Sequence, residues 1–187
     1  MNTRVVALCL GGMLGSASLF AASPYAGEQS REIKALSADD VVGLRAGKGM
    51  GYAKAAELNG FAGPAHVLEL ADALRLTADQ RARTEALFAS MSAKASARGR
   101  ALVDKERELD ALFASRTITP ERLATSLQAI GALQAEVREA HLEAHLAQVQ
   151  ILTAEQNARY ADLRRYGRSA PRGERSHGGH RHGAPRP

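Results

Sequence analysis

Residues 139–156 read EAHLEAHLAQVQILTAEQ, and this stretch holds the two patterns from which we predict the fold and the function. The first pattern is a pair of histidines, His141 and His145, spaced four residues apart. On a helix, that spacing puts both side chains on one face, one turn apart. The second pattern is Leu152–Gln156 (LTAEQ), which restates Leu76–Gln80 (LTADQ) from earlier in the chain.

Each copy of this repeat has the residues expected at the start of a helix. The threonine suits the N-cap position, where its hydroxyl accepts a backbone N–H of the first turn. The glutamine three residues later can reach back to the N–H of the cap itself. Asp79 and Glu155 place negative charge at the positive end of the helix dipole. A single T-x-x-Q is ordinary at a helix start, whereas two copies that each follow a leucine form a more specific signal.

Two long helices are predicted between and around the motifs. The first spans about residues 78–115 and the second about residues 120–150, where Thr119 caps and Pro120 takes the first helical position. Leucines and other apolar residues recur at spacings of three and four, which is the period of a helix face. These are Leu87, Met91, Ala95, Leu102, Leu109 and Leu112 with Phe88 and Phe113, then Leu123, Leu127, Ile130, Leu133 and Val137. The short connection makes the pair an antiparallel hairpin.

Shorter helices are predicted on both sides of this hairpin. They cover about residues 37–45, 52–58, 66–74 and 154–166, the last with Tyr160, Leu163 and Tyr166 on its apolar side, and residues 23–36 read as a polar linker. The fold class is therefore all-α, a long antiparallel helical hairpin with short helices folded against it. Aromatic residues make up only 4% of the chain, which favours such thin helical packing. A slim body leaves apolar surface uncovered, so we also expect a dimer.

The first 26 residues read as an export signal. Arg4 precedes an apolar run that ends near Ala22, and small and polar residues follow. Neither alanine-rich junction offers a clean small-x-small cleavage site, so the segment is either a signal peptide or an uncleaved N-terminal anchor. Cys9, the one cysteine, lies inside it, so the exported part has no disulfide and no thiolate metal site. Export indicates the bacterial periplasm.

The rest of the chain divides by composition into three parts. Residues 27–63 combine a linker with short, glycine-interrupted helices, residues 64–166 form the helical domain, and residues 167–187 are an Arg/His-rich tail expected to be disordered. The net charge of +5 comes from Arg4 and from a tail excess of four, so the body is formally neutral. A neutral body and the absence of aromatic interleaving argue against nucleic acid as a partner. The chain also lacks the motifs of nucleophilic hydrolases, phosphate-binding loops and H-E-x-x-H proteases, so no enzyme is predicted.

His141 and His145 are the leading candidates for metal ligands. Neutral imidazoles at i and i+4 can bind one zinc, nickel, cobalt or copper ion, although two ligands are too few for a tight site. Pairing the hairpin about its turn brings His141 level with about Lys94 and His145 level with about Ser90. If the helix that carries His66 folds back along the long helix about Leu76, His66 comes level with about Leu87, within a turn of the His145 level. Weaker candidates at that level are Glu69, Glu85 and Met91. The alternative is that these histidines are structural.

The tail offers a second and different metal-binding pattern. His177, His180 and His182 lie in a short glycine-containing tract, and flexible tracts of this kind bind nickel, copper or zinc loosely. The equally open alternative is a basic, soluble, low-complexity tail.

The leader, the twin motifs LTADQ and LTAEQ, and the hairpin between them resemble the periplasmic LTxxQ-motif family over about residues 64–166. That family includes Spy/CpxP-type chaperones, the zinc resistance-associated protein and the heavy-metal resistance sensors of efflux systems. The resemblance implies an all-α, usually dimeric protein that is not an enzyme. Metal-sensing members carry one histidine pair before the first motif and an H-x-x-x-H/M pair late in the returning helix. His141 and His145 match the late pair, but of the early pair only His66 is present, because Leu70 stands at the second position.

Two functions from different classes follow from these observations. The first is a sensor-like protein of heavy-metal resistance that needs no obligatory cofactor and binds Zn, Ni, Co or Cu through His141, His145 and His66. Its partner would be a membrane-bound regulator. The second is an ATP-independent, Spy/CpxP-like chaperone or stress regulator that binds unfolded periplasmic proteins, and in it the histidines are structural.

Overall fold

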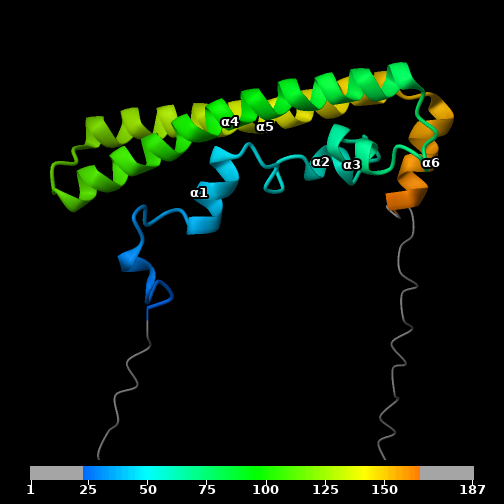
Figure 1. The fold of residues 1–187 in the computed structure, drawn as a ribbon. Helices are drawn as coiled ribbons and strands as arrows, with labels where there is room; N and C mark the ends of the chain where they lie inside the picture. Colours follow the sequence, from blue (N-terminus) through cyan, green and yellow to red (C-terminus); the bar gives the residue numbers. More distant parts are fainter. Residues whose placement is uncertain (1–22, 165–187) are drawn as a thin grey trace, which may run out of the picture. The chain divides into compact units, whose positions relative to one another are not determined.

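A computed structural model describes residues 23–164, and every regular element in that range is a helix. The chain divides into two units, Met1–Ser30 and Arg31–Pro187. The described part of the first unit contains a turn and the short 3-10 helix η1, Glu28–Ser30. The second unit holds all six α-helices of the described residues (Figure 1). None of the helices within residues 23–164 combines the length and the apolar character needed to cross a membrane.

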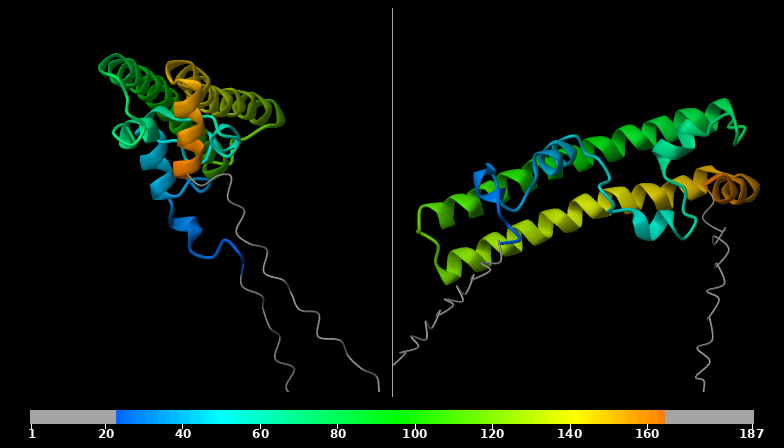
Figure 2. Two further views of the ribbon diagram at one scale, coloured as in Figure 1. Left: turned by 90° about the vertical axis from the view of Figure 1, so that its right-hand side faces the viewer. Right: turned by 90° about the horizontal axis from the view of Figure 1, so that it is seen from below.

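The predicted hairpin is present as helices α4, Ala78–Ala114, and α5, Pro120–Ile151. The two run side by side in Figures 1 and 2 and are joined by a short turn. The Thr119 hydroxyl accepts the Arg122 backbone N–H at 3.3 Å, and Pro120 takes the first helical position, where its missing N–H costs nothing. The all-α fold and the long helix pair are therefore confirmed.

The register of the hairpin also agrees with the predicted pairing about its turn. Lys94 of α4 forms an ion pair with Glu143 of α5, with 3.6 Å between Nζ and Oε2. Nearer the open end, the Gln148 amide donates to the Thr84 hydroxyl at 3.1 Å. His141 and His145 consequently lie opposite the middle of the first half of α4.

Three short helices lie along one face of the α4–α5 pair: α1 (Ala38–Arg45), α2 (Lys54–Glu57) and α3 (Pro64–Glu69). Helix α6, Ala154–Arg164, turns toward the same face at the end of the hairpin. Helices α2 and α3 are shorter than predicted. Glycines and turns surround α2, and the chain leaves α3 through successive turns between Leu70 and Leu76.

Two glycines allow the first short helix to approach the hairpin closely. A Cβ built at Gly99 of α4 would lie 2.0 Å from the Leu44 carbonyl oxygen at the end of α1. At Gly47, where φ is +67°, a Cβ would lie 2.8 Å from the Ser92 carbonyl oxygen. No side chain fits at these distances, so the packing of α1 against α4 depends on both glycines.

Apolar packing occurs in two separate clusters of buried residues. One comprises Ile33, Leu44, Leu102, Val103 and Ile130, and the other Ala62, Val67, Leu74, Leu152 and Tyr160. Ile33 corrects the prediction that residues 23–36 are a polar linker, because its side chain is 2% exposed in the first cluster. Ile33 is a single apolar residue among polar ones, so no apolar periodicity in the sequence indicated that it would be buried.

Four residues predicted on or beside apolar helix faces are exposed instead, two of them on α4: Phe88 at 37% and Phe113 at 54%. Leu127 of α5 is 51% exposed and Leu163 of α6 is 41% exposed. Leu127 lies near the hairpin turn, and the short helices cover only part of each long helix. Tyr166, predicted beside Leu163, lies outside the described residues.

Candidate functional site

The two LTxxQ motifs form the helix caps that their sequences predict. Thr77 accepts the Gln80 N–H at 3.1 Å while the Gln80 side chain accepts the Thr77 N–H at the same distance. In the second copy, the corresponding distances between Thr153 and Gln156 are 3.2 Å and 2.9 Å. Both are capping boxes at the starts of α4 and α6.

The glutamines of the two motifs also bond to each other, which the sequence does not reveal. Gln80 Nε2 donates to Gln156 Oε1 at 2.8 Å, and Gln156 Nε2 donates to Gln80 Oε1 at 3.0 Å. Each amide further donates to the carbonyl that precedes the other motif, Gln80 to Ile151 at 3.0 Å and Gln156 to Leu74 at 3.1 Å. The two copies of the motif thus form one hydrogen-bonded unit, which holds the two helix starts together at the open end of the hairpin.

A cavity of about 470 Å³ lies between the short helices and the hairpin. His66, His141 and His145 all line it, together with Glu57 and Met91. Histidines from two different helices, far apart in the sequence, therefore meet at one cavity. Such a concave site with a few convergent polar groups is the usual setting for a ligand.

His141 is held in the cavity wall through one ring nitrogen. Its side chain is 4% exposed, and the backbone of Lys48 lies next to its ring. Nε2 is buried without a hydrogen-bond partner, so Nδ1 is the ring nitrogen that can face Lys48. Burial lowers the pKa of His141, and the nearby His145 lowers it further, which favours the neutral ring. A neutral ring that carries its proton on Nδ1 has a free lone pair on Nε2.

His145, one turn later on α5, is held in the same way. Its Nδ1 lies 2.8 Å from the Phe61 carbonyl oxygen and 3.6 Å from Glu57 Oε2. Its Nε2 lies beside Gly63, where a Cβ would come within 2.9 Å of that nitrogen. The glycine leaves room at Nε2 that any other residue would fill.

Glu57 connects the remaining polar groups of the cavity wall. Its Oε1 accepts the Tyr160 hydroxyl at 2.5 Å, lies 3.1 Å from His66 Nδ1 and pairs with Arg164 Nε at 3.3 Å. His66 Nε2 lies 3.4 Å from a second Arg164 nitrogen. Both ring nitrogens of His66 are therefore engaged, and a guanidinium faces the one that a metal ion would need.

Sequence reasoning missed Glu57, because it ends a short alanine-rich helix without any periodic signal. It also assigned Tyr160 only to an apolar face. The ring of Tyr160 is indeed buried, but its hydroxyl belongs to the polar network. The tyrosine among alanines and charged residues in the last helix was the one sequence feature that suggested a buried polar contact there.

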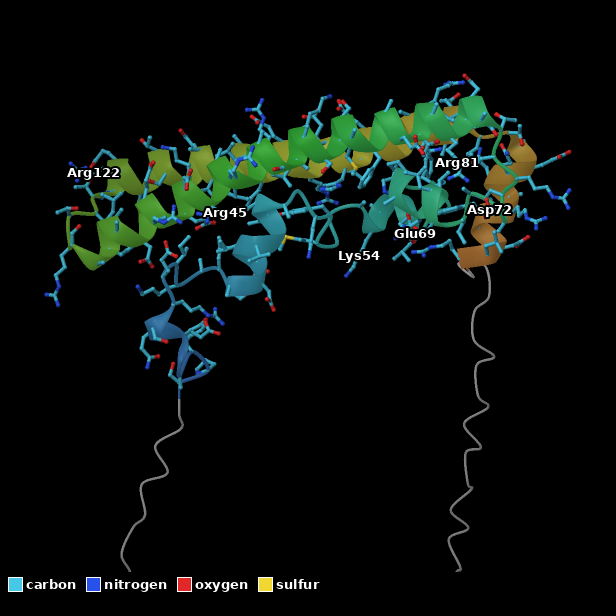
Figure 3. The ribbon with its side chains drawn as sticks, viewed as in Figure 1. Arg45, Lys54, Glu69, Asp72, Arg81 and Arg122 are labelled. Carbon is cyan, nitrogen blue, oxygen red and sulfur yellow. The ribbon has the colours of Figure 1, made fainter. Side chains whose placement is uncertain are left out.

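The weaker candidates lie in different places. Met91 is 9% exposed and lines the cavity. Glu69, on α3 in Figure 3, and Glu85, on α4, are exposed and are not among the residues that line it. His177, His180 and His182 lie outside the described residues.

The residues fit part of a metal coordination shell. Within residues 23–164, no group of three or more His, Cys, Asp or Glu side chains is placed to hold a metal ion. A closed zinc site of four such ligands is thus not formed by this part of the chain. What the cavity provides is two imidazoles, one of them held at Nδ1 by the Phe61 carbonyl, with His141 Nε2 buried and without a hydrogen-bond partner.

The LTXXQ motif family model matches residues 64–164, which is more than half of the chain. The chain belongs to this family, as its twin motifs predict. Members are typically periplasmic and are generally not enzymes. No curated protein and no solved structure gives a significant match to the chain.

Proposed function

We propose that this member of the LTXXQ family is a non-enzymatic periplasmic protein that binds a transition-metal ion through Nε2 of His141 and Nε2 of His145. The apolar leader supports export to the periplasm, and the cavity geometry supports the ligand pair. The bound ion would act as a signal or a cargo for metal resistance.

The observation that carries the proposal is how the two rings are held. Metal-binding histidines commonly donate the other ring N–H to a backbone carbonyl, which fixes both the tautomer and the direction of the ring. His145 Nδ1 lies 2.8 Å from the Phe61 carbonyl oxygen, and the backbone of Lys48 lies next to the His141 ring. A buried imidazole nitrogen without a partner is costly, and a metal ion is one of the few partners that it can take.

His66 has a supporting role in this proposal. Its bonds to Glu57 and Arg164 fasten α3 against α2 and α6, next to the ligand pair. The remaining coordination positions are left to water or to ligands of other types. The tail histidines His177, His180 and His182 form a second, looser site.

The test is a calorimetric titration of zinc, nickel and copper(II) into the full chain with the three tail histidines changed to alanine. In the same background, His141→Asn/His145→Asn keeps an amide N–H near the position of Nδ1, so the bonds to the backbone carbonyls are retained. It removes the Nε2 lone pairs, and we expect affinity to fall by about tenfold or more.

His66→Asn is the matched control, because it changes the same residue type in the same cavity without removing a proposed ligand. Circular dichroism checks that each variant keeps its helices. Absence of saturable binding by the background protein would contradict the proposal, as would equal losses in the control and in the double variant.

A second candidate function is chaperone-like binding of unfolded proteins, as in the Spy/CpxP branch. It is favoured by large apolar side chains that the long helices expose, among them Phe113 at 54%, Leu127 at 51% and Leu146 at 58%. A homodimer would extend such a surface. Suppression of aggregation of a denatured client would support this function. Loss of that activity in Phe113→Ser/Leu127→Ser, with metal binding unchanged, would separate it from the first.

A further inference from the structure

We infer that the ion preferred at this site is a soft monovalent one, copper(I), and that the sulfur of Met91 is its third ligand. The inference rests on the proposed function and adds the class of metal. The thioether of Met91 adds a softer type of donor to the two imidazoles.

Met91 lies at the same level of the hairpin as the two histidines. On one side it lines the cavity that His141 and His145 line. On its other side it lines a small hollow together with Ala140 and Ala144, the residues that directly precede the two histidines. Since it belongs to α4, Met91 faces the ligand pair across the helix interface. It is nearly buried, so few competing waters surround it.

The chemistry of this donor set selects the ion by softness. A thioether sulfur is a soft, uncharged ligand that favours copper(I) and its analogue silver(I), whereas zinc and nickel are well served by imidazole and carboxylate. Two imidazoles and one thioether supply three donors, a coordination number that a monovalent d¹⁰ ion readily accepts.

The charges around the cavity also favour a monovalent ion. An imidazole binds a metal ion in its uncharged form, and a thioether carries no charge. The one carboxylate in the wall, Glu57, is matched by its ion pair with Arg164. Lys48 and Lys54 line the same cavity and add positive charge. The cost of burying an uncompensated ion rises steeply with its charge, so a neutral donor set holds a monovalent ion more readily than a divalent one.

The experiment compares silver(I), used as a redox-inert probe in chloride-free nitrate buffer, with zinc(II). Both ions are titrated into the full chain that lacks the tail histidines and carries Cys9→Ser, because a cysteine thiolate would itself bind silver(I). Met91→Leu removes the sulfur at nearly constant volume, a change that cores tolerate well. We expect silver affinity to fall by about tenfold or more while zinc affinity stays within about twofold.

Met50→Leu is the control, because Met50 lines the same cavity but its sulfur packs beside Gly43 of α1, which does not line it. NMR of carbon-13-labelled methionine methyl groups adds a direct signature. Silver should shift the Met91 signal, whereas zinc should not.

The outcomes separate the two proposals. If both ions bind through His141 and His145 but Met91→Leu leaves silver affinity and the methyl signal unchanged, the copper(I) inference is overturned and the proposed function stands. If neither ion binds, the proposed function is overturned as well.

Discussion

Both halves of the hairpin bury apolar side chains, but buried polar side chains accompany them in only one half of the described hairpin. In the motif half, near the LTxxQ pair, the buried residues include Gln80, Thr84, His141, His145 and Gln148, which are all the buried polar residues in the described part of the chain. In the turn half, the buried cluster of Ile33, Leu44, Leu102, Val103 and Ile130 is entirely apolar. One chain thus uses two ways of joining the same pair of helices.

This difference indicates that the motif half contains polar groups that stabilise the fold less readily than apolar burial does, at positions where they can take part in specific interactions. Apolar burial is non-directional and needs only a matching volume, at roughly 25 cal/mol per Å². A buried polar group needs a partner at a defined place, and leaving one unpaired costs about 1–3 kcal/mol. His141 Nε2 and Gln148 Oε1 are both left unpaired, and both are in the motif half. A half built only for stability would have no reason to keep them.

The strongest test of the apolar half is Leu102→Ala. Leu102 is 1% exposed, and truncating a fully buried leucine removes transfer energy and leaves a cavity, so we expect a loss of about 2–5 kcal/mol. Urea unfolding followed by circular dichroism measures this loss. Leu127→Ala, at an exposed site on the same hairpin, should cost less than about 0.5 kcal/mol. Similar losses in the two variants would mean that this cluster does not hold the turn half together.

The polar half is tested by Gln80→Ala. The substitution removes the amide pair with Gln156 and the bond to the Ile151 carbonyl, and we expect a loss of about 1–3 kcal/mol. Exposed Gln150→Ala is the control. In a double-mutant cycle, Gln80→Ala and Gln156→Ala should be clearly non-additive, because each variant already breaks the shared pair. Strict additivity would show that the two motifs act only as separate caps.

The smallest expected effect is a dependence of stability on pH that arises from His141. Burial lowers its pKa below the ordinary value of 6.5 in the folded chain, so the unfolded chain binds more protons in the window just below that value. The free energy of unfolding should therefore fall as the pH drops below about 6.5, and this contribution should level off below the folded pKa. Unfolding is measured with a chelator present.

His141→Asn serves as the reference for that measurement, since asparagine does not titrate. The difference between the native chain and the variant isolates the contribution of one ring from those of other titrating groups. A difference that does not change between pH 7.5 and pH 5 would contradict the buried neutral histidine.

The sequence predicted correctly those features of the fold that depend on residues close together in the chain. Capping residues and three-and-four spacing placed α4 and α5 within about a residue or two of their observed ends, because caps and apolar periodicity act over single turns. The hairpin register followed from the length of its turn and brought His141 and His145 to one level, and folding the preceding helix back about Leu76 brought His66 close to that level. All three do line one cavity.

The parts that were missed depend on contacts between distant residues. Nothing in the sequence near Glu57 indicates that it meets Tyr160, more than a hundred residues away. The hydrogen bonds between Gln80 and Gln156 could not be predicted either. The capping role alone explains the glutamine in each motif, so nothing in the sequence suggested a second partner. Ile33 was missed because one apolar residue among polar ones has no period.

The exchange of hydrogen bonds between the two glutamines has a consequence for how the chain unfolds. Terminal helices usually fray independently of the body of a protein. Here, releasing the first turn of α6 also removes the Gln156 partner from Gln80, which caps the first turn of α4. The starts of two helices more than seventy residues apart in sequence are therefore one cooperative unit, which opens or stays closed as a whole.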